Sequence, residues 1–374
     1  MATTNQQILN ILRKVKHPEQ QQDIVSLGMV DDIQIEGKKI SFTLYFKKSN
    51  DPFTSSIRKA CVQSIEEELG EQASVRGNIT VRIPEKKQKA GKQQDQPENT
   101  FPGVKNIVAI ASGKGGVGKS TIAANLAVAM AKKGLKIGLI DADIFGPSIP
   151  KMYNVEGQRP YVEKVDDQEH INPIEQYGVK VLSIGFFVDP ESALIWRGPM
   201  ATNALRQMIH QGKWGELDYL LIDLPPGTSD IHLTLVQELP VTGAAIVSTP
   251  QKVALADAIK GIRMFTEEKI NVPVLGLIEN MSWFTPAELP DNKYYIFGKD
   301  GCKNLAEKEN LPLLGQIPIV QSIMEGGEKG QPSALDSDSQ TGQAFYHLAE
   351  NLIQATEQRN TNQDPTQRVH IKNQ

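Results

Sequence analysis

The sequence predicts an α/β protein in which a large domain with a doubly wound, mostly parallel sheet follows a small α+β domain. The main observation is a series of short, nearly continuous apolar runs, each followed by a stretch long enough for a helix. These runs cover residues 107–111, 137–140, 179–184, 219–222, 244–247 and 274–278. Strands that are apolar on both faces and alternate with helices indicate a parallel sheet that helices cover on both sides.

A polar segment separates this region from a different pattern upstream. Residues 85–100, EKKQKAGKQQDQPENT, contain one hydrophobic residue, an alanine, as is typical of a linker. Before it, the pattern predicts a helix at 6–15, an alternating strand at 40–46, a helix at 52–69 and a strand at 79–83. We therefore expect a small α+β domain at 1–84, a linker at 85–102, a second domain at 103–356 and a polar tail at 357–374. The last helix of the second domain is expected at about 341–356.

The composition excludes several classes of protein. With 374 residues, 39% hydrophobic and 22% charged residues and a net charge of -4, the chain gives no general reason to expect nucleic acid binding. Two cysteines are too few for a disulfide framework, and residues 1–20 lack the apolar core of a signal peptide. No apolar run approaches the roughly 18 residues of a membrane span. We expect a cytoplasmic protein that binds neither membranes nor nucleic acid.

The most specific motif lies between the first apolar run and the helix expected at 121–133. Residues 113–120 read GKGGVGKS and fit the phosphate-binding pattern G-x-x-x-x-G-K-[ST]. Its glycines let backbone N–H groups wrap around phosphates, Lys119 reaches the β and γ oxygens, and the Ser120 hydroxyl can bind Mg²⁺. The residues expected to contact the nucleotide phosphates are Gly113, Lys114, Gly115, Gly116, Val117, Gly118, Lys119, Ser120 and Thr121.

A dinucleotide-binding loop is the competing interpretation. Gly113, Gly115 and Gly118 also spell G-x-G-x-x-G, and Asp141 lies where a ribose-binding acid would follow the next strand. That fold gives no reason for Lys119 and Ser120 or for a further acidic strand end. Phosphoryl transfer needs a lysine, a hydroxyl that binds the metal and a second carboxylate, so the motif favours an ATPase.

Lys114 lies inside the loop at a position that the general pattern leaves open. With it, the sequence resembles the MinD, ParA and nitrogenase iron-protein group of deviant Walker A ATPases. The resemblance implies that Lys114 reaches the nucleotide of a partner subunit, so that the protein would be a homodimer. A solvated surface lysine is the alternative.

Acidic residues follow two of the expected strands. Asp141 and Asp143 come after the run 137–140, and Asp223 ends the run 219–222, so that all three should lie beside the phosphates at the carboxyl edge of the sheet. Asp223 fits an acid that binds Mg²⁺ through water. The resemblance implies that Asp141 helps to hold the metal shell and that Asp143 orients the attacking water. A helix cap is the alternative for Asp143.

Two further positions are expected to contact the nucleotide. Gly227, in the sequence LPPGT after Asp223, would let its N–H approach the γ phosphate and sense its presence. Asn280 follows the strand expected at 274–279, and its amide can pair with the adenine edge, which favours ATP over GTP. This second assignment rests partly on resemblance, and a turn-forming asparagine is the alternative.

Together these motifs resemble the Mrp/ApbC family from residue 104 to about residue 356. The resemblance rests on residues 113–120, DADIFGPSIP at 141–150, WRGPM at 196–200, the segment 223–228 and ENMS at 279–282. Residues 23–30, DIVSLGMV, resemble the small iron-sulfur-assembly domain that is often fused to these ATPases. The family implies ATP-dependent carriage of an iron–sulfur cluster, with apoproteins or assembly scaffolds as partners.

The cysteines depart from the family pattern. The resemblance implies a Cys-x-x-Cys after ENMS, with which two subunits would hold one [4Fe–4S] cluster, yet residues 283–289 read WFTPAEL, and residues 50–52 read NDP where relatives often have a cysteine. Cys302, at the start of an expected helix, could supply one thiolate per subunit, whereas Cys61 is expected in a core. Two alternatives stay open: a nucleotide-switched scaffold that has lost the cluster, and a positioning ATPase similar to MinD or ParA.

Overall fold

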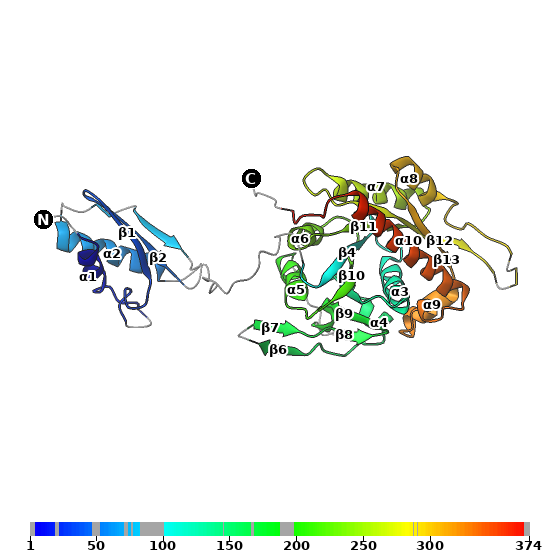
Figure 1. Cartoon of the computed structure of the whole chain (residues 1–374), viewed down its shortest axis with the longest axis horizontal. Coiled ribbons are helices and arrows are strands. Elements are labelled where there is room, and N and C mark those ends of the chain that lie inside the picture. The colour runs from blue at the N-terminus through cyan, green and yellow to red at the C-terminus, as the bar shows by residue number, and fades with distance from the viewer. Residues whose placement is uncertain are drawn as a thin grey trace. The chain divides into compact units, whose positions relative to one another are not determined.

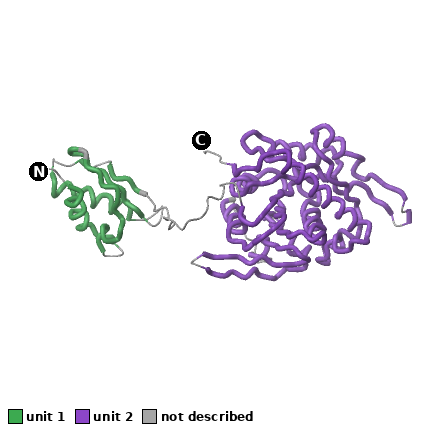
Figure 2. The backbone as a smooth tube through the Cα atoms, viewed as in Figure 1, with its two compact units in different colours: residues 1–95 green, residues 96–374 purple. Residues whose placement is uncertain are grey.

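The computed structural model describes residues 4–18, 22–46, 53–70, 74–75, 78–82, 101–144, 146–165, 168–187, 198–286, 288–289 and 291–369. The chain divides into two compact units, residues 1–95 and 96–374, which Figure 2 shows in different colours. Residues 50–52, 85–100 and 196–197, to which the sequence analysis assigned motifs or a linker, lie outside the described residues. Each unit is described by itself.

The first unit is a small α+β fold. Its described elements are α1 (Asn5–Leu12), β1 (Val30–Glu36), β2 (Lys39–Tyr45), α2 (Thr54–Leu69) and β3 (Ile79–Arg82). Strand β2 lies in the middle of the sheet, antiparallel to β1 and parallel to β3. Both helices cover it, because the apolar residues of each helix recur on one side and are buried against β2. Cys61 is among these core residues, as the sequence predicted.

The second unit contains a sheet of eight strands in its described part (Figure 1). Across the sheet the order is β13-β12-β11-β4-β10-β5-β9-β8, and only the short edge strand β8 runs antiparallel to its neighbour. The strands are β4 (Val104–Ala111), β5 (Ile137–Asp141), β8 (Ile174–Gln176), β9 (Val179–Ser183), β10 (Leu217–Asp223), β11 (Gly243–Ser248), β12 (Val274–Phe284) and β13 (Leu313–Ile319). A separate hairpin joins β6 (Val162–Val165) to β7 (Gln168–Ile171).

Helices cover both faces of this sheet, which makes the fold doubly wound. Alternate residues of β4 enter different cores: Ile107 and Ala109 pack with one set of helices, and Val108 and Ile110 with the other. The first face carries α5 (Gly198–His210), α6 (Asp230–Glu238), α7 (Lys252–Thr266) and α8 (Gly301–Glu309). The second carries α3 (Lys119–Lys132), α4 (Ile149–Met152), α9 (Gln321–Glu328), α10 (Gln340–Asn362) and the short 3-10 helix η3 (Ser333–Leu335). A further 3-10 helix, η2 (Ile184–Phe186), follows β9.

This architecture confirms the predicted fold class, and the largest differences in the bounds of the predicted elements are at the ends of β12 and α10. The strand expected to stop before Asn280 continues to Phe284, although a positive φ of 56° at Met281 and a shift in register interrupt it. The last helix runs to Asn362 instead of Thr356, because Thr356 and Arg359 are buried on its inner side. Within the described residues, no helix combines the length and apolar character needed to cross a membrane.

Candidate functional site

The loop 113–118 connects the end of β4 to the start of α3, and close packing fixes its shape. A Cβ atom on Gly113 would lie 2.0 Å from the main-chain oxygen of Asp257 in α7, a distance that no side chain can accommodate without movement. Gly118, with φ of 80°, precedes the first helical residue, and a Cβ there would lie 2.3 Å from Asn280 Nδ2. Glycine is therefore required at both positions, and the loop leaves its N–H groups at the amino end of α3, where they favour an anion.

Two carboxylates and a hydroxyl lie beside the ammonium of Lys119, the first residue of α3. Its side chain is only 5% exposed, and Nζ lies 2.6 Å from Asp223 Oδ1, 3.7 Å from Asp143 Oδ2 and 3.3 Å from Ser120 Oγ. The strand order brings these acids close to Lys119, because β10 lies between β4 and β5 and Asp223 pairs in register with Asp141. The structure thus brings together the lysine, the serine and the acids that the sequence predicted at one edge of the sheet.

Asp141 is fully buried and is held by three donors. Ser183 Oγ donates to Oδ2 at 2.8 Å, the Ile149 N–H donates to the same oxygen at 3.3 Å, and the Asp143 N–H donates to Oδ1 at 3.2 Å. Burial, and next the charge of Asp223, raise the pKa of Asp141 to about 8. Burial likewise raises the pKa of Asp223, although Lys119 opposes this. Burial therefore favours the protonated form of both acids, and Lys119 offsets this effect only in part.

The residues present fit a Mg²⁺ site. Asp223 Oδ2 is buried and has no hydrogen-bond partner in the described part of the chain, which is costly for a carboxylate oxygen. Ser120 Oγ lies 3.3 Å from the lysine ammonium that contacts Asp223, and Asp141 pairs in register with Asp223, so that hydroxyl and carboxylate oxygens, the ligands that Mg²⁺ prefers, come from neighbouring elements here. A divalent cation or its bound water would supply the missing partner of Asp223.

The segment after Asp223 is hydrogen-bonded to the residue that precedes the loop 113–118. The Gly227 N–H donates to the Ser112 carbonyl at 2.8 Å, so that a contact from this N–H to a γ phosphate would require the bond to break. Downstream, Nδ1 of the buried His232 accepts hydrogen bonds from the Ser229 N–H and hydroxyl, each at 3.2 Å. Burial lowers the pKa of His232 to about 4, and this imidazole therefore stays neutral at physiological pH.

A second part of the site is a cavity of about 630 Å³ beside the loop. The residues that line it include Gly118, Thr121, Asn280, Ile319 and Met324. Asn280 Nδ2 donates to the Val117 carbonyl at 2.8 Å, so that the amide supports the loop in this structure. The volume is typical of a cavity for a small ligand, and its position suits the nucleoside of a phosphate-bound nucleotide.

Lys114 and Cys302 have opposite environments. The Lys114 side chain is exposed, and among the described residues its ammonium makes no hydrogen bond or ion pair. Cys302 lies in the first turn of α8 and is fully buried. Its N–H donates to Glu279 Oε2 at 2.6 Å, and its Sγ lies 3.9 Å from the Thr249 carbonyl oxygen. Burial and the nearby Glu279 raise the pKa of the Cys302 thiol. The prediction that Cys302 supplies one iron ligand per subunit therefore requires this buried thiol to become accessible.

The sequence analysis missed residues that position the site. Ser183 holds Asp141 from the end of β9, and a polar residue at the carboxyl end of an apolar strand was the same signal that identified Asp141. His232 gave no such signal, because its role depends on the turn that brings Ser229 back over it. The cavity lining from Ile319 and Met324 depends on the position of β13, which periodicity alone did not reveal.

The fold and the site define a P-loop nucleotide-binding protein. The sequence signature of the family described as NUBPL iron-transfer P-loop NTPase matches residues 103–353, and that described as iron-sulfur cluster assembly protein matches residues 5–76. The chain belongs to this P-loop NTPase family and carries the assembly-type domain before it.

Individual relatives agree with this assignment. An iron-sulfur cluster carrier protein of Synechocystis is 41% identical over 93% of this chain and 97% of its own length. An iron-sulfur protein required for NADH dehydrogenase in Arabidopsis thaliana mitochondria is 48% identical over 70% of this chain and 82% of its own. A solved nucleotide-binding protein of Archaeoglobus fulgidus, in complex with ADP, is 38% identical, with a TM-score of 0.54 over 63% of this chain and 90% of that protein.

Proposed function

We propose that this protein is an ATPase that carries an iron–sulfur cluster as cargo and delivers it to apoproteins. The observation that carries the proposal is the buried Lys119, which lies beside Asp223 and Asp143 at a phosphate-binding loop. Family membership supports the nature of the cargo, since curated relatives that match nearly the whole chain are named iron-sulfur cluster carrier proteins. A cytoplasmic location is part of the proposal.

Each residue of the site has a part in ATP hydrolysis. Lys119 would exchange its ion pair with Asp223 for the β and γ phosphates, whose negative charge it offsets. Ser120, Asp223 and Asp141 would hold Mg²⁺ or its bound water, and this ion would neutralise charge on the phosphates when bound. Asp143, whose Oδ2 lies 3.7 Å from the ammonium that would bind the γ phosphate, would orient the attacking water.

A homodimer would complete the site. Lys114 is exposed and unpaired among the described residues, although it lies within the loop that surrounds the phosphates. We propose that the lysine contacts the nucleotide of a second copy, so that ATP occupancy changes the geometry of the dimer. Adenine would occupy the cavity that Asn280 helps to line.

An assay of the phosphate released from ATP tests the ATPase proposal. Lys119→Ala should abolish ATP turnover, because it removes the buried cation that faces the phosphates. Lys114→Ala should abolish turnover too while the protein remains folded, because the residue is exposed. The matched control is Lys132→Ala, an exposed lysine at the far end of α3. Turnover by purified Lys119→Ala equal to that of the unmodified chain would remove the proposal.

A second candidate function is a nucleotide-switched scaffold that works through contacts with clients and holds no cluster. Both cysteines are buried, and the described residues contain no group of three or more His, Cys, Asp or Glu side chains arranged to hold a metal. Anaerobic reconstitution with iron and sulfide distinguishes the two candidates. A cluster absorption band that persists through gel filtration favours the carrier, and its loss in Cys302→Ala but not in Cys61→Ala would assign the ligand. Protein that retains no iron favours the scaffold.

A further inference from the structure

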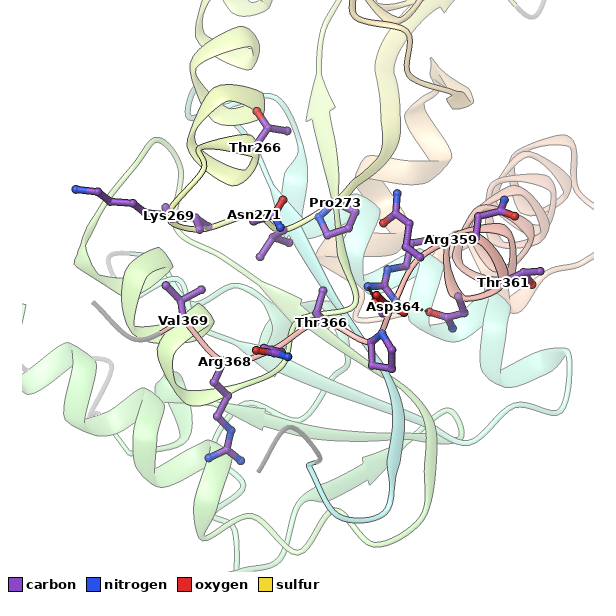
Figure 3. Close-up of a pocket in the computed structure, with 17 residues that line it drawn as sticks. Thr266, Lys269, Asn271, Pro273, Arg359, Thr361, Asp364, Thr366, Arg368 and Val369 are labelled. Carbon is purple, nitrogen blue, oxygen red and sulfur yellow. Dashed lines mark hydrogen bonds between the residues drawn. The ribbon is translucent and has the colours of Figure 1, made fainter. Parts of the chain in front are cut away.

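A second cavity lies at the edge of the sheet opposite the phosphate-binding loop. It has a volume of about 1150 Å³, and its walls are the connection from α7 to β12 and the segment that follows α10, residues 363–369 (Figure 3). Val272 and Pro273, which line it, directly precede the amino end of β12, whereas the phosphate-binding loop follows the carboxyl end of β4. The eight residues of β4 span roughly 25 Å at about 3.3 Å each, so that the two sites are well separated.

Arg359, in the last turn of α10, is the polar side chain that this cavity buries most deeply. It is 9% exposed, and Figure 3 shows it reaching from the helix toward the segment at Asp364. Its Nη1 donates to Asn360 Oδ1 at 3.1 Å and its Nη2 to the Asp364 carbonyl at 2.6 Å, while Nε is buried without a partner. Within the described residues, no carboxylate lies within 4.0 Å of this guanidinium.

A buried guanidinium whose hydrogen-bond partners are all neutral lacks a negative charge to compensate for its own. Desolvation of a charge costs several kcal/mol unless an opposite charge compensates for it. Burial lowers the pKa of Arg359, and the exposed Asp364 opposes this only in part. Two further cations, Lys269 and Arg368, line the cavity, and the Nε of Arg368 is also buried without a partner. In Figure 3 the side chains of Lys269 and Arg368 extend away from Arg359.

We propose that this cavity is a binding site for a small oxyanion, a phosphate or carboxylate group of a larger polar molecule, with Arg359 as its main ligand. The planar guanidinium presents donors in the geometry that such oxygens accept. Asn271 and Thr366 add amide and hydroxyl groups to the walls, and the volume leaves room for the remainder of the molecule. The site is separate from the nucleotide phosphates and does not depend on ATP hydrolysis.

Calorimetric titration of the full chain, saturated with ADP and Mg²⁺ so that the phosphate-binding loop is occupied, tests the proposal. Inorganic phosphate is the probe in one arm and citrate in the other, with ionic strength held constant by NaCl. We expect saturable binding of at least one anion, and an affinity about tenfold lower in Arg359→Gln, as is usual for the loss of a charge-assisted hydrogen bond. Binding of phosphate alone or of citrate alone would identify the chemistry of the ligand.

Two further variants keep the test independent of folding. Lys269→Gln alters an exposed side chain at the rim and should weaken binding about two- to threefold without any effect on the protein's melting temperature. Arg263→Gln is the matched control, because Arg263 is an exposed arginine of α7, the helix that precedes Lys269, and its partner is Glu309, outside the cavity. The proposal is overturned if neither anion binds, or if Arg263→Gln weakens binding as much as Arg359→Gln and Lys269→Gln do.

Discussion

Replacement of Lys119 by methionine should make the stability of the second unit depend more strongly on pH. Methionine keeps most of the apolar stem and removes only the ammonium, which lies 2.6 Å from Asp223 Oδ1. Asp223 is fully buried, and its pKa is already raised by burial although the lysine lowers it. Without the lysine, the pKa of Asp223 must rise further.

The sign of the effect follows from this shift. An acid whose pKa is higher in the folded than in the unfolded protein contributes stability that is fully present below its unfolded pKa near 4 and is lost as the pH rises through its folded pKa. Breaking a buried ion pair by removal of one partner costs about 3 to 5 kcal/mol when the remaining charge persists. We therefore expect Lys119→Met to lose about 3 kcal/mol at pH 8, and at least about 1 kcal/mol less than that at pH 5.

Urea unfolding followed by tryptophan fluorescence measures this loss. All three tryptophans, Trp196, Trp214 and Trp283, belong to the second unit, so that the signal reports on the unit that contains the site. The control is Lys114→Met, which alters an exposed lysine of the same loop and should change the stability by less than about 0.5 kcal/mol. If Lys119→Met were equally destabilising at both pH values, or kept its full effect in an Asp223→Asn background, the electrostatic argument would be refuted.

Three further predictions concern the same unit. Lys114→Ala should leave the unfolding transition unchanged and reduce the ATP-dependent increase in mass seen by light scattering, and an unchanged dimer would contradict the role of this lysine. Gly113→Ala should destabilise the unit by about 1 to 3 kcal/mol and weaken ADP binding, because its Cβ would meet the Asp257 carbonyl. Gly115→Ala is the control and should be tolerated, because its Cβ would lie 3.8 Å from its nearest neighbour. The free energy of unfolding of the ligand-free protein should decrease less between pH 4 and pH 8 in Asp141→Asn than in the unmodified chain, since the pKa of this acid is raised to about 8. Equal pH dependence of this free energy in the two proteins would exclude Asp141 as the cause.

The central strands of the second unit and the acids of the site could both be predicted from one pattern, an apolar run that ends in an acidic residue. A strand buried on both faces must be apolar along its length, so that Asp141 and Asp223 marked where β5 and β10 end. The ion pair between Lys119 and Asp223, 104 residues apart in sequence, then depended only on β4 and β10 being neighbours.

Other features could not be predicted from local patterns. The hydrogen bond from Asn280 to the Val117 carbonyl joins β12 to the loop across β11, and no sequence periodicity encodes such a contact. The position of Cys302 at the start of a helix suggested access, yet the packing of α8 against the sheet buries it completely. Strand β13 escaped notice because Gly315 and Pro318 interrupt its apolar run.

The pair of acids beside Lys119 has a consequence for the form in which nucleotide enters. Asp143 and Asp223 both lie close to the ammonium of Lys119, so that a bare triphosphate that takes over this ammonium would leave the two acids without their cation. A triphosphate already chelated by a divalent cation brings its own compensating charge. The protein should therefore respond to the supply of metal–nucleotide complex, and free nucleotide should compete poorly for the site.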